Sequence, residues 1–185
     1  MTYYSVDLKL TMNPLLPEID IYSLSTAPWE LLNLNLFNPE VKNLFEILDL
    51  DLRMGSMFTM KENSTGNVHL DGIRPSDRVK INWVIGSDHI MNWYSIKNTT
   101  IQKLHEIRVP DNQNMPSRNY VSYNANQVEL IHSQSVGYPS LIQSGIPHNV
   151  INFKGIRKCI SIMLYTKSGN FLTMSQAIQK FSKYR

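Results

Sequence analysis

The 185-residue sequence has a single cysteine, Cys159, which lies in an apolar run. One cysteine excludes an intrachain disulfide and a zinc site built from cysteines. No stretch approaches the roughly 20 apolar residues of a transmembrane helix. The first ten residues carry Asp7 and Lys9, unlike the apolar part of a signal peptide. We therefore expect a cytoplasmic protein without membrane contact.

Concentrated positive charge is also lacking. The net charge is +3, and the basic residues form no run apart from a mildly basic end at Lys180, Lys183 and Arg185. Charge therefore does not indicate a nucleic-acid partner. The composition indicates neither the substrate nor the oligomeric state. The abundance of Asn, Ile, Lys and Tyr is typical of an AT-rich genome, such as that of a virus or phage, and a viral chain would lie in the host cytoplasm.

Helical signals are few and lie near the two ends. Residues 1–37 carry apolar runs broken by three prolines, which indicates an extended N-terminal cover. Asn38-Pro39-Glu40 is typical of a helix start, with Asn as N-cap and Pro at the first helical position. Apolar residues at helical spacing then predict a helix over 39–48. Ser175 is a candidate cap for a final helix within residues 174–183.

The middle of the chain is rich in short strand signals. β-Branched and aromatic segments bounded by turn residues fall at 57–60, 67–71, 78–85, 91–96, 127–134, 140–144, 148–152 and 157–165. This pattern predicts a mainly β chain, a sandwich or jelly roll with a few flanking helices. We expect one domain over 1–185, with a core at about 56–165 and an N-terminal cover over 1–55. The polar segment 97–125 is predicted to be a long connection or lid beside the substrate mouth.

One short motif carries metal-binding chemistry. In an extended strand, His69 and Asp71 of His69-Leu70-Asp71 point to the same face and can reach one metal ion together. The imidazole of His148 would complete a set of two histidines and one carboxylate. This set leaves open positions on a non-haem Fe(II) ion. Arg157 follows His148 by nine positions and would add a cation beside the metal.

His132 is the main competitor for the second imidazole. No basic residue follows it at the same distance, since positions 141 and 142 are Leu and Ile. The two other histidines, His89 in a turn and His105 in the polar segment, are expected to be solvated.

The combination of His69-x-Asp71, a distal His148 and a following Arg157 resembles the Fe(II)/2-oxoglutarate-dependent oxygenase superfamily, over approximately residues 66–165. The resemblance implies a double-stranded β-helix, which is a cupin-like variant of the jelly roll. RVKINWVIGS and GIPHNVIN look like the second and seventh core strands of that family.

The resemblance also implies roles for the motif residues. His69, Asp71 and His148 would bind Fe(II) as the catalytic centre, and Arg157 would pair with the distal carboxylate of 2-oxoglutarate. The implied reaction uses O2, decarboxylates 2-oxoglutarate to succinate and CO2, and hydroxylates an unknown substrate.

Further polar residues are candidates for binding the cosubstrate or substrate. Ser161 shares a strand face with Arg157 by alternation, although family members often place Ser at the position of Cys159. Asn82 is a candidate on the strand at 78–85, where it shares a face with Lys80. Tyr94 is a candidate on the strand at 91–96.

Two other functions remain open from the sequence. One is a cupin-like metal protein that uses the same three ligands without 2-oxoglutarate. The other is a non-enzymatic jelly-roll domain for binding or structure, in which the motif is coincidental. A need for Arg157 separates the oxygenase from the cupin-like protein, and metal binding separates both from the third function.

Overall fold

A computed structural model describes residues 3–72, 75–86, 88–97, 103–107, 118–137 and 139–185. The strands are β1 Ser5–Asp7, β2 Trp29–Leu32, β3 Leu50–Asp51, β4 Gly55–Met60, β5 Ser64–Thr65, β6 Val68–Leu70, β7 Val79–Ile85, β8 His89–Ile96, β9 Lys103–Ile107, β10 Arg118–Tyr123, β11 Val128–Gln134, β12 Ser140–Gln143, β13 His148–Asn152, β14 Arg157–Met163 and β15 Tyr165–Thr166. The α-helices are α1 Ile21–Leu24, α2 Pro39–Ile47 and α3 Met174–Lys180. Short 3-10 helices cover Leu34–Leu36, Ala125–Gln127 and Ser182–Tyr184.

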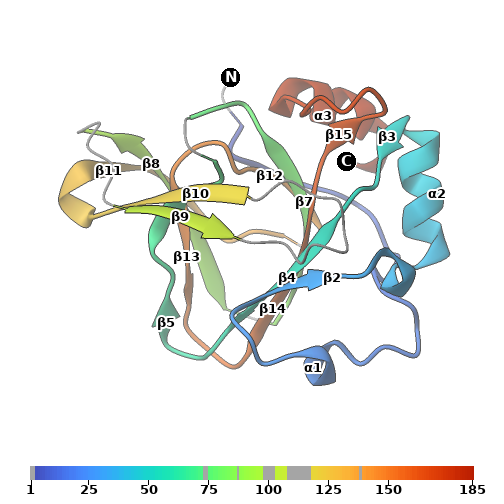
Figure 1. The fold of residues 1–185 in the computed structure, drawn as a ribbon, viewed down its shortest axis with the longest axis horizontal. Coiled ribbons are helices and arrows are strands. Elements are labelled where there is room, and N and C mark those ends of the chain that lie inside the picture. The colour runs from blue at the N-terminus through green and yellow to red at the C-terminus, as the bar shows by residue number, and fades with distance from the viewer. Residues whose placement is uncertain (1–2, 73–74, 87, 98–102, 108–117, 138) are drawn as a thin grey trace.

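Two antiparallel sheets form the body of the molecule (Figure 1). The first sheet has the strand order β1-β12-β7-β14-β4-β2. The second has the order β11-β8-β13-β6-β10-β9, with β5 paired to β13. Eight core strands are divided equally between the two sheets. The first sheet contributes β4, β7, β12 and β14, and the second contributes β6, β8, β11 and β13. This arrangement is a double-stranded β-helix, so the predicted mainly β, jelly-roll fold is confirmed.

The order of these eight strands corrects one detail. Counted along the chain, β13 is the seventh core strand, as expected for GIPHNVIN. The strand of RVKINWVIGS, β7, is the third and not the second, because β4 and the His69 strand β6 both precede it.

The main apolar core lies outside the sandwich, on the face of the first sheet that is turned away from the second sheet. Ile81 and Trp83 of β7 and Ile160 of β14 are fully buried there. They belong to one packed cluster with α2 and α3, which lie on the same side of the molecule in Figure 1. Side chains of a strand alternate between faces. The other residues of β7 and β14 therefore face the second sheet across the interior.

The helix ends follow local capping rules. The Asn38 side chain accepts a hydrogen bond from the Glu40 N–H, and Pro39 opens α2 as predicted. Helix α3 is capped two residues earlier than predicted. Thr173, not Ser175, accepts the N–H of Gln176, and the Gln176 side chain returns a bond to the Thr173 N–H. None of the helices in the described parts of the chain is long and apolar enough to span a membrane.

The segment predicted as a long connection contains two strands. β9 and β10 pair with each other, and β10 pairs with β6 beside the metal motif. The prediction was wrong for these residues because ladder hydrogen bonds to a distant strand compensate for their polar sequence. Residues 98–102 and 108–117 lie outside the described residues.

Candidate metal centre

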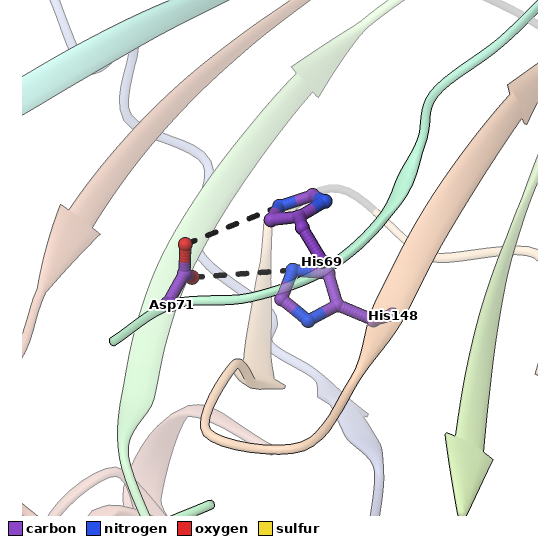
Figure 2. A group of neighbouring side chains, drawn as sticks. All are labelled: His69, Asp71 and His148. Atoms are coloured by element: carbon purple, nitrogen blue, oxygen red, sulfur yellow. Dashed lines mark ion pairs between the residues drawn. The ribbon is translucent and has the colours of Figure 1, made fainter. Parts of the chain in front are cut away.

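Strand pairing brings the two histidines of the motif together. His69 lies in β6, His148 opens β13, and the two are directly opposite in the antiparallel pair, so both side chains emerge on one face. Asp71 follows the end of β6 by one residue. One ligand atom from each residue can be chosen so that all three lie within 4.8 Å of one another. Figure 2 shows both imidazoles facing the carboxylate.

The backbone fixes the tautomer of both imidazoles. Nδ1 of His69 lies 2.9 Å from the Asn67 carbonyl oxygen, and Nδ1 of His148 lies 2.8 Å from that of Ile146. A carbonyl only accepts, so each Nδ1 must donate. In a neutral ring this leaves the lone pair on Nε2, and the Nε2 atoms are the ones that approach Asp71, at 4.0 and 3.9 Å. The hydrogen bond from Nδ1 to a backbone carbonyl is the contact by which metal-binding histidines orient their rings.

Asp71 is held as a carboxylate inside the protein. Lys80 of β7 reaches across from the other sheet and places its Nζ 2.6 Å from Oδ2. Burial alone would raise the pKa of Asp71, but the charge of Lys80, followed by electrostatic contributions from the imidazoles of His148 and His69, lowers it well below its ordinary value. Arg78 also donates to the Asp71 backbone carbonyl, at 3.2 Å. The carboxylate is therefore ionised and oriented at neutral pH.

His148 is neutral over the physiological range. Burial and the neighbouring His69 lower its pKa from 6.5 to about 3. A metal ion binds the neutral imidazole, so no proton has to be displaced from His148 at pH 7. The three residues together offer two imidazole nitrogens and one carboxylate oxygen.

The opposite wall of the interior carries a second cation. Arg157, Cys159 and Ser161 alternate along β14 on the face opposite Ile160 and are nearly fully buried. No carboxylate among the described residues pairs with Arg157, and its Nε has no hydrogen-bond partner there. Asn82 of β7 lies directly beside Ser161 in the ladder, and its buried Oδ1 also lacks a partner. Three of the predicted cosubstrate residues thus share this wall.

Phe58 and Cys159 connect the triad to Arg157. The Lys80 ammonium lies 5.6 Å from the Phe58 ring centroid as well as beside Asp71. Phe58 is the cross-strand partner of Cys159, two residues from Arg157 on the same face. Burial raises the pKa of the Cys159 thiol, opposed by the charges of Arg157 and Lys80. Both cations therefore lie near this thiol, one toward the triad and one away from it.

Tyr94, a further predicted cosubstrate residue, is not brought to this interior. Its hydroxyl donates to the Asn149 side chain at 3.1 Å. It packs with Leu70 and Val121 on the outer face of the second sheet. His148 and Asn149 are adjacent in β13 and point to opposite faces, so Tyr94 lies behind the sheet that carries the triad.

His132 is likewise separate from the triad. Its ring stacks on Tyr4 with centroids 4.8 Å apart, and Trp93 of β8 stands between it and His148 in the ladder. The choice of His148 over His132 as the third member of the cluster therefore agrees with the geometry.

Two groups near the interior were not found from the sequence. His89 was expected to be solvated, but it opens β8 and is 7% exposed. Tyr120 of β10 meets His69 edge-on at 6.0 Å, and His105 stacks on Tyr120 at 4.3 Å. The polar sequence around these residues hid them, although alternation within β8 would place His89 with Trp93.

Comparison with known proteins gives distant similarities of fold alone. No family model and no curated protein matches the chain. HygX of Streptomyces hygroscopicus, with nickel and 2-oxoglutarate bound, is 10% identical with a TM-score of 0.41, over 79% of this chain and 73% of that one. CapF of Staphylococcus aureus, a capsular polysaccharide assembling protein, is 13% identical with a TM-score of 0.30, over 67% of this chain and 29% of that one. This chain thus spans under a third of the CapF chain. Values this low carry no argument, and the fold assignment rests on the strand order.

The Lys80–Asp71 pair predicts a coupled effect on stability. Asp71→Asn leaves the Lys80 ammonium buried without a carboxylate, which should lower the free energy of unfolding of the metal-free protein by about 3–5 kcal/mol. Adding Lys80→Met should recover most of this loss. Urea unfolding in the presence of a chelator measures both changes. Strictly additive losses in the double variant would contradict the pairing.

His89 predicts a pH dependence of stability. Burial and the charge of Arg157 lower its pKa from 6.5 to about 4. Between these values the unfolded chain binds a proton that the folded chain excludes, so the free energy of unfolding should fall as pH falls from 6.5 to about 4. His89→Gln cannot take up this proton and should show a shallower slope in urea unfolding across that window. Equal slopes in the two proteins would contradict this prediction.

Proposed function

We propose that this protein is an Fe(II)- and 2-oxoglutarate-dependent oxygenase that hydroxylates a substrate still to be identified. His69, Asp71 and His148 would hold the iron, and Arg157 would hold the distal carboxylate of 2-oxoglutarate. With O2, the bound iron and cosubstrate would supply oxidative decarboxylation to succinate and CO2, coupled to oxidation of the substrate.

The donor set fits a divalent iron ion. Two imidazoles and one carboxylate on a single face leave the remaining positions open for other ligands, which is the set that non-haem Fe(II) oxygenases use. The Nε2 atom of each imidazole faces the carboxylate of Asp71, which is ionised. The same donors also suit neighbouring divalent metals, so the choice of iron belongs to the proposal.

The observation that carries the cosubstrate is Arg157. A guanidinium that is 4% exposed and has no carboxylate partner among the described residues is costly to bury unless an anion pairs with it. It lies in the same interior as the triad, and the planar fork of Arg binds a carboxylate through two parallel hydrogen bonds. A metal protein that binds no anion would have no use for this cation.

The neighbouring side chains have supporting roles in the proposal. Lys80 holds Oδ2 of Asp71, which leaves Oδ1 for the metal and keeps the carboxylate in one orientation. Asn82 and Ser161 offer polar atoms along the same wall. Tyr120 lies beside His69 and is the described residue of the 97–125 segment that is best placed to meet a substrate.

Anaerobic titration tests the whole proposal. Fe(II) with 2-oxoglutarate should give a weak charge-transfer band in visible spectroscopy, and His69→Ala should abolish it. In air, the wild-type protein should release succinate above the level of this variant. Metal binding without 2-oxoglutarate binding would favour the cupin-like function instead. Binding of neither would favour a non-enzymatic domain.

Removal of Arg157 should separate the two ligands. Arg157→Ala loses charge-assisted hydrogen bonds worth about 1.5–3 kcal/mol, so 2-oxoglutarate affinity should fall by roughly 10–150-fold while metal affinity is nearly unchanged. Calorimetric titration with Mn(II), and then with 2-oxoglutarate, measures both. Lys154→Ala, which removes an exposed cation from the turn before β14, is the matched control. Equal loss of both affinities would indicate a folding role for Arg157.

A further inference from the structure

The inner face of the second sheet carries a pair of stacked rings beside the metal ligands. His69 pairs with Ser122 of β10, and Ser122 pairs with Lys103 of β9, so this row of side chains continues the metal-binding face to the edge of the sheet. Tyr120 is two residues from Ser122 and lies on the same face, with His105 of β9 as its cross-strand partner. The strand register thus places both rings on the side of the sheet that presents the triad.

The contacts of the two rings agree with this placement. His105 stacks on Tyr120 with centroids 4.3 Å apart and ring planes within 3° of each other. The Nε2 atom of His105 lies 3.1 Å from the Ser122 hydroxyl oxygen, which holds the imidazole in this orientation. The Tyr120 ring also meets the His69 ring, nearly perpendicular to it, with centroids 6.0 Å apart. The stacked pair is therefore fixed next to a candidate metal ligand.

Core packing does not account for this pair. Tyr120 belongs to none of the packed apolar clusters of the described residues, and the side chains of Tyr120 and His105 both stay partly exposed. Val121, the next residue of β10, points to the other face and is fully buried there. A cross-strand ring pair stabilises the ladder between β9 and β10, but it would do so equally well on that outer face. Its place beside His69, next to the exposed Lys103 of the edge strand, indicates a binding surface that solvent can reach.

We propose that the stacked pair of Tyr120 and His105 is the surface on which the substrate rests, and that the substrate presents a planar aromatic or heteroaromatic ring to it. This inference rests on the proposed function and names the substrate class for its metal site. A flat ring gains the attraction between π-systems in addition to the burial of its area, whereas an aliphatic group of equal size gains the burial alone. Because Tyr120 contacts the His69 ring, a group held on this surface lies close to the candidate metal ligands.

Proton NMR relaxation with two alcohols tests this surface. Mn(II)-loaded protein with 2-oxoglutarate would be titrated with benzyl alcohol and with cyclohexylmethanol, which share a carbon skeleton and differ in the aromatic ring. Bound Mn(II) speeds the relaxation of protons held near it, so the signal reports both binding and position. Benzyl alcohol should be relaxed more strongly than cyclohexylmethanol. Tyr120→Leu should weaken benzyl alcohol binding by about 2–10-fold and change cyclohexylmethanol binding and Mn(II) affinity by less than about twofold.

Three further variants complete the comparison. Tyr120→Phe keeps the ring and should retain benzyl alcohol binding. Tyr22→Leu removes an exposed tyrosine of α1 and is the matched control, with no change expected. His105→Ala removes the supporting ring and should also weaken benzyl alcohol binding, so it carries the comparison if Tyr120→Leu does not fold.

The outcomes separate this inference from the proposed function. If Mn(II) and 2-oxoglutarate bind but the two alcohols are relaxed equally, the stacking surface is overturned and the function stands. Unchanged benzyl alcohol binding in Tyr120→Leu would have the same meaning. Loss of Mn(II) affinity in Tyr120→Leu, in step with the loss of benzyl alcohol, would show that the ring only supports His69 and would also overturn the surface. A wild-type protein that binds neither Mn(II) nor 2-oxoglutarate would overturn both proposals.

Discussion

The ion pair between Asp71 and Lys80 is the constraint on which the interior depends. One partner follows β6 in the second sheet, and the other lies in β7 of the first, so the pair joins the two sheets across the sandwich. Asp71 must stay ionised to bind a metal, and in this buried place it does so because Lys80 offsets the cost of burial. The site is thus prepared before any ion arrives.

The interior around Lys80 and Arg157 is polar, whereas Met91, Trp93 and Ile142 form a small apolar cluster elsewhere between the sheets. The larger apolar core lies outside the sandwich. β7 and β14 turn Trp83, Ile81 and Ile160 away from the second sheet, toward α2 and α3. In an ordinary sandwich the apolar faces meet between the sheets. Here the helices and the N-terminal segment bury the hydrophobic faces of the strands, which frees the space between the sheets for Lys80 and Arg157. The flanking elements therefore make these buried polar side chains compatible with a stable fold.

Alternation within a strand could be read from the sequence, and pairing between strands could not. The faces of β7 and β14 follow from a period of two, which correctly grouped Asn82 with Lys80 and Arg157 with Ser161. Tyr94 was wrongly placed in the site, because the sheet face on which it lies depends on how β8 pairs with β13, and the sequence does not show this pairing. β9 and β10 were missed because polar residues give little strand signal without their partners. His89 was missed for a related reason, since a turn sequence does not reveal what covers it.

Charge balance links the two ligands of the proposed site. Within the described interior, Lys80 and Arg157 stand against the single carboxylate of Asp71. A divalent metal adds two positive charges to this excess, which is unfavourable in a buried place. A dicarboxylate removes two. Each ligand should therefore improve the binding of the other, and by linkage the coupling is equal in both directions. The arrangement of Lys80, Asp71 and Arg157 therefore supports the proposed binding of a metal and a dianion in one site.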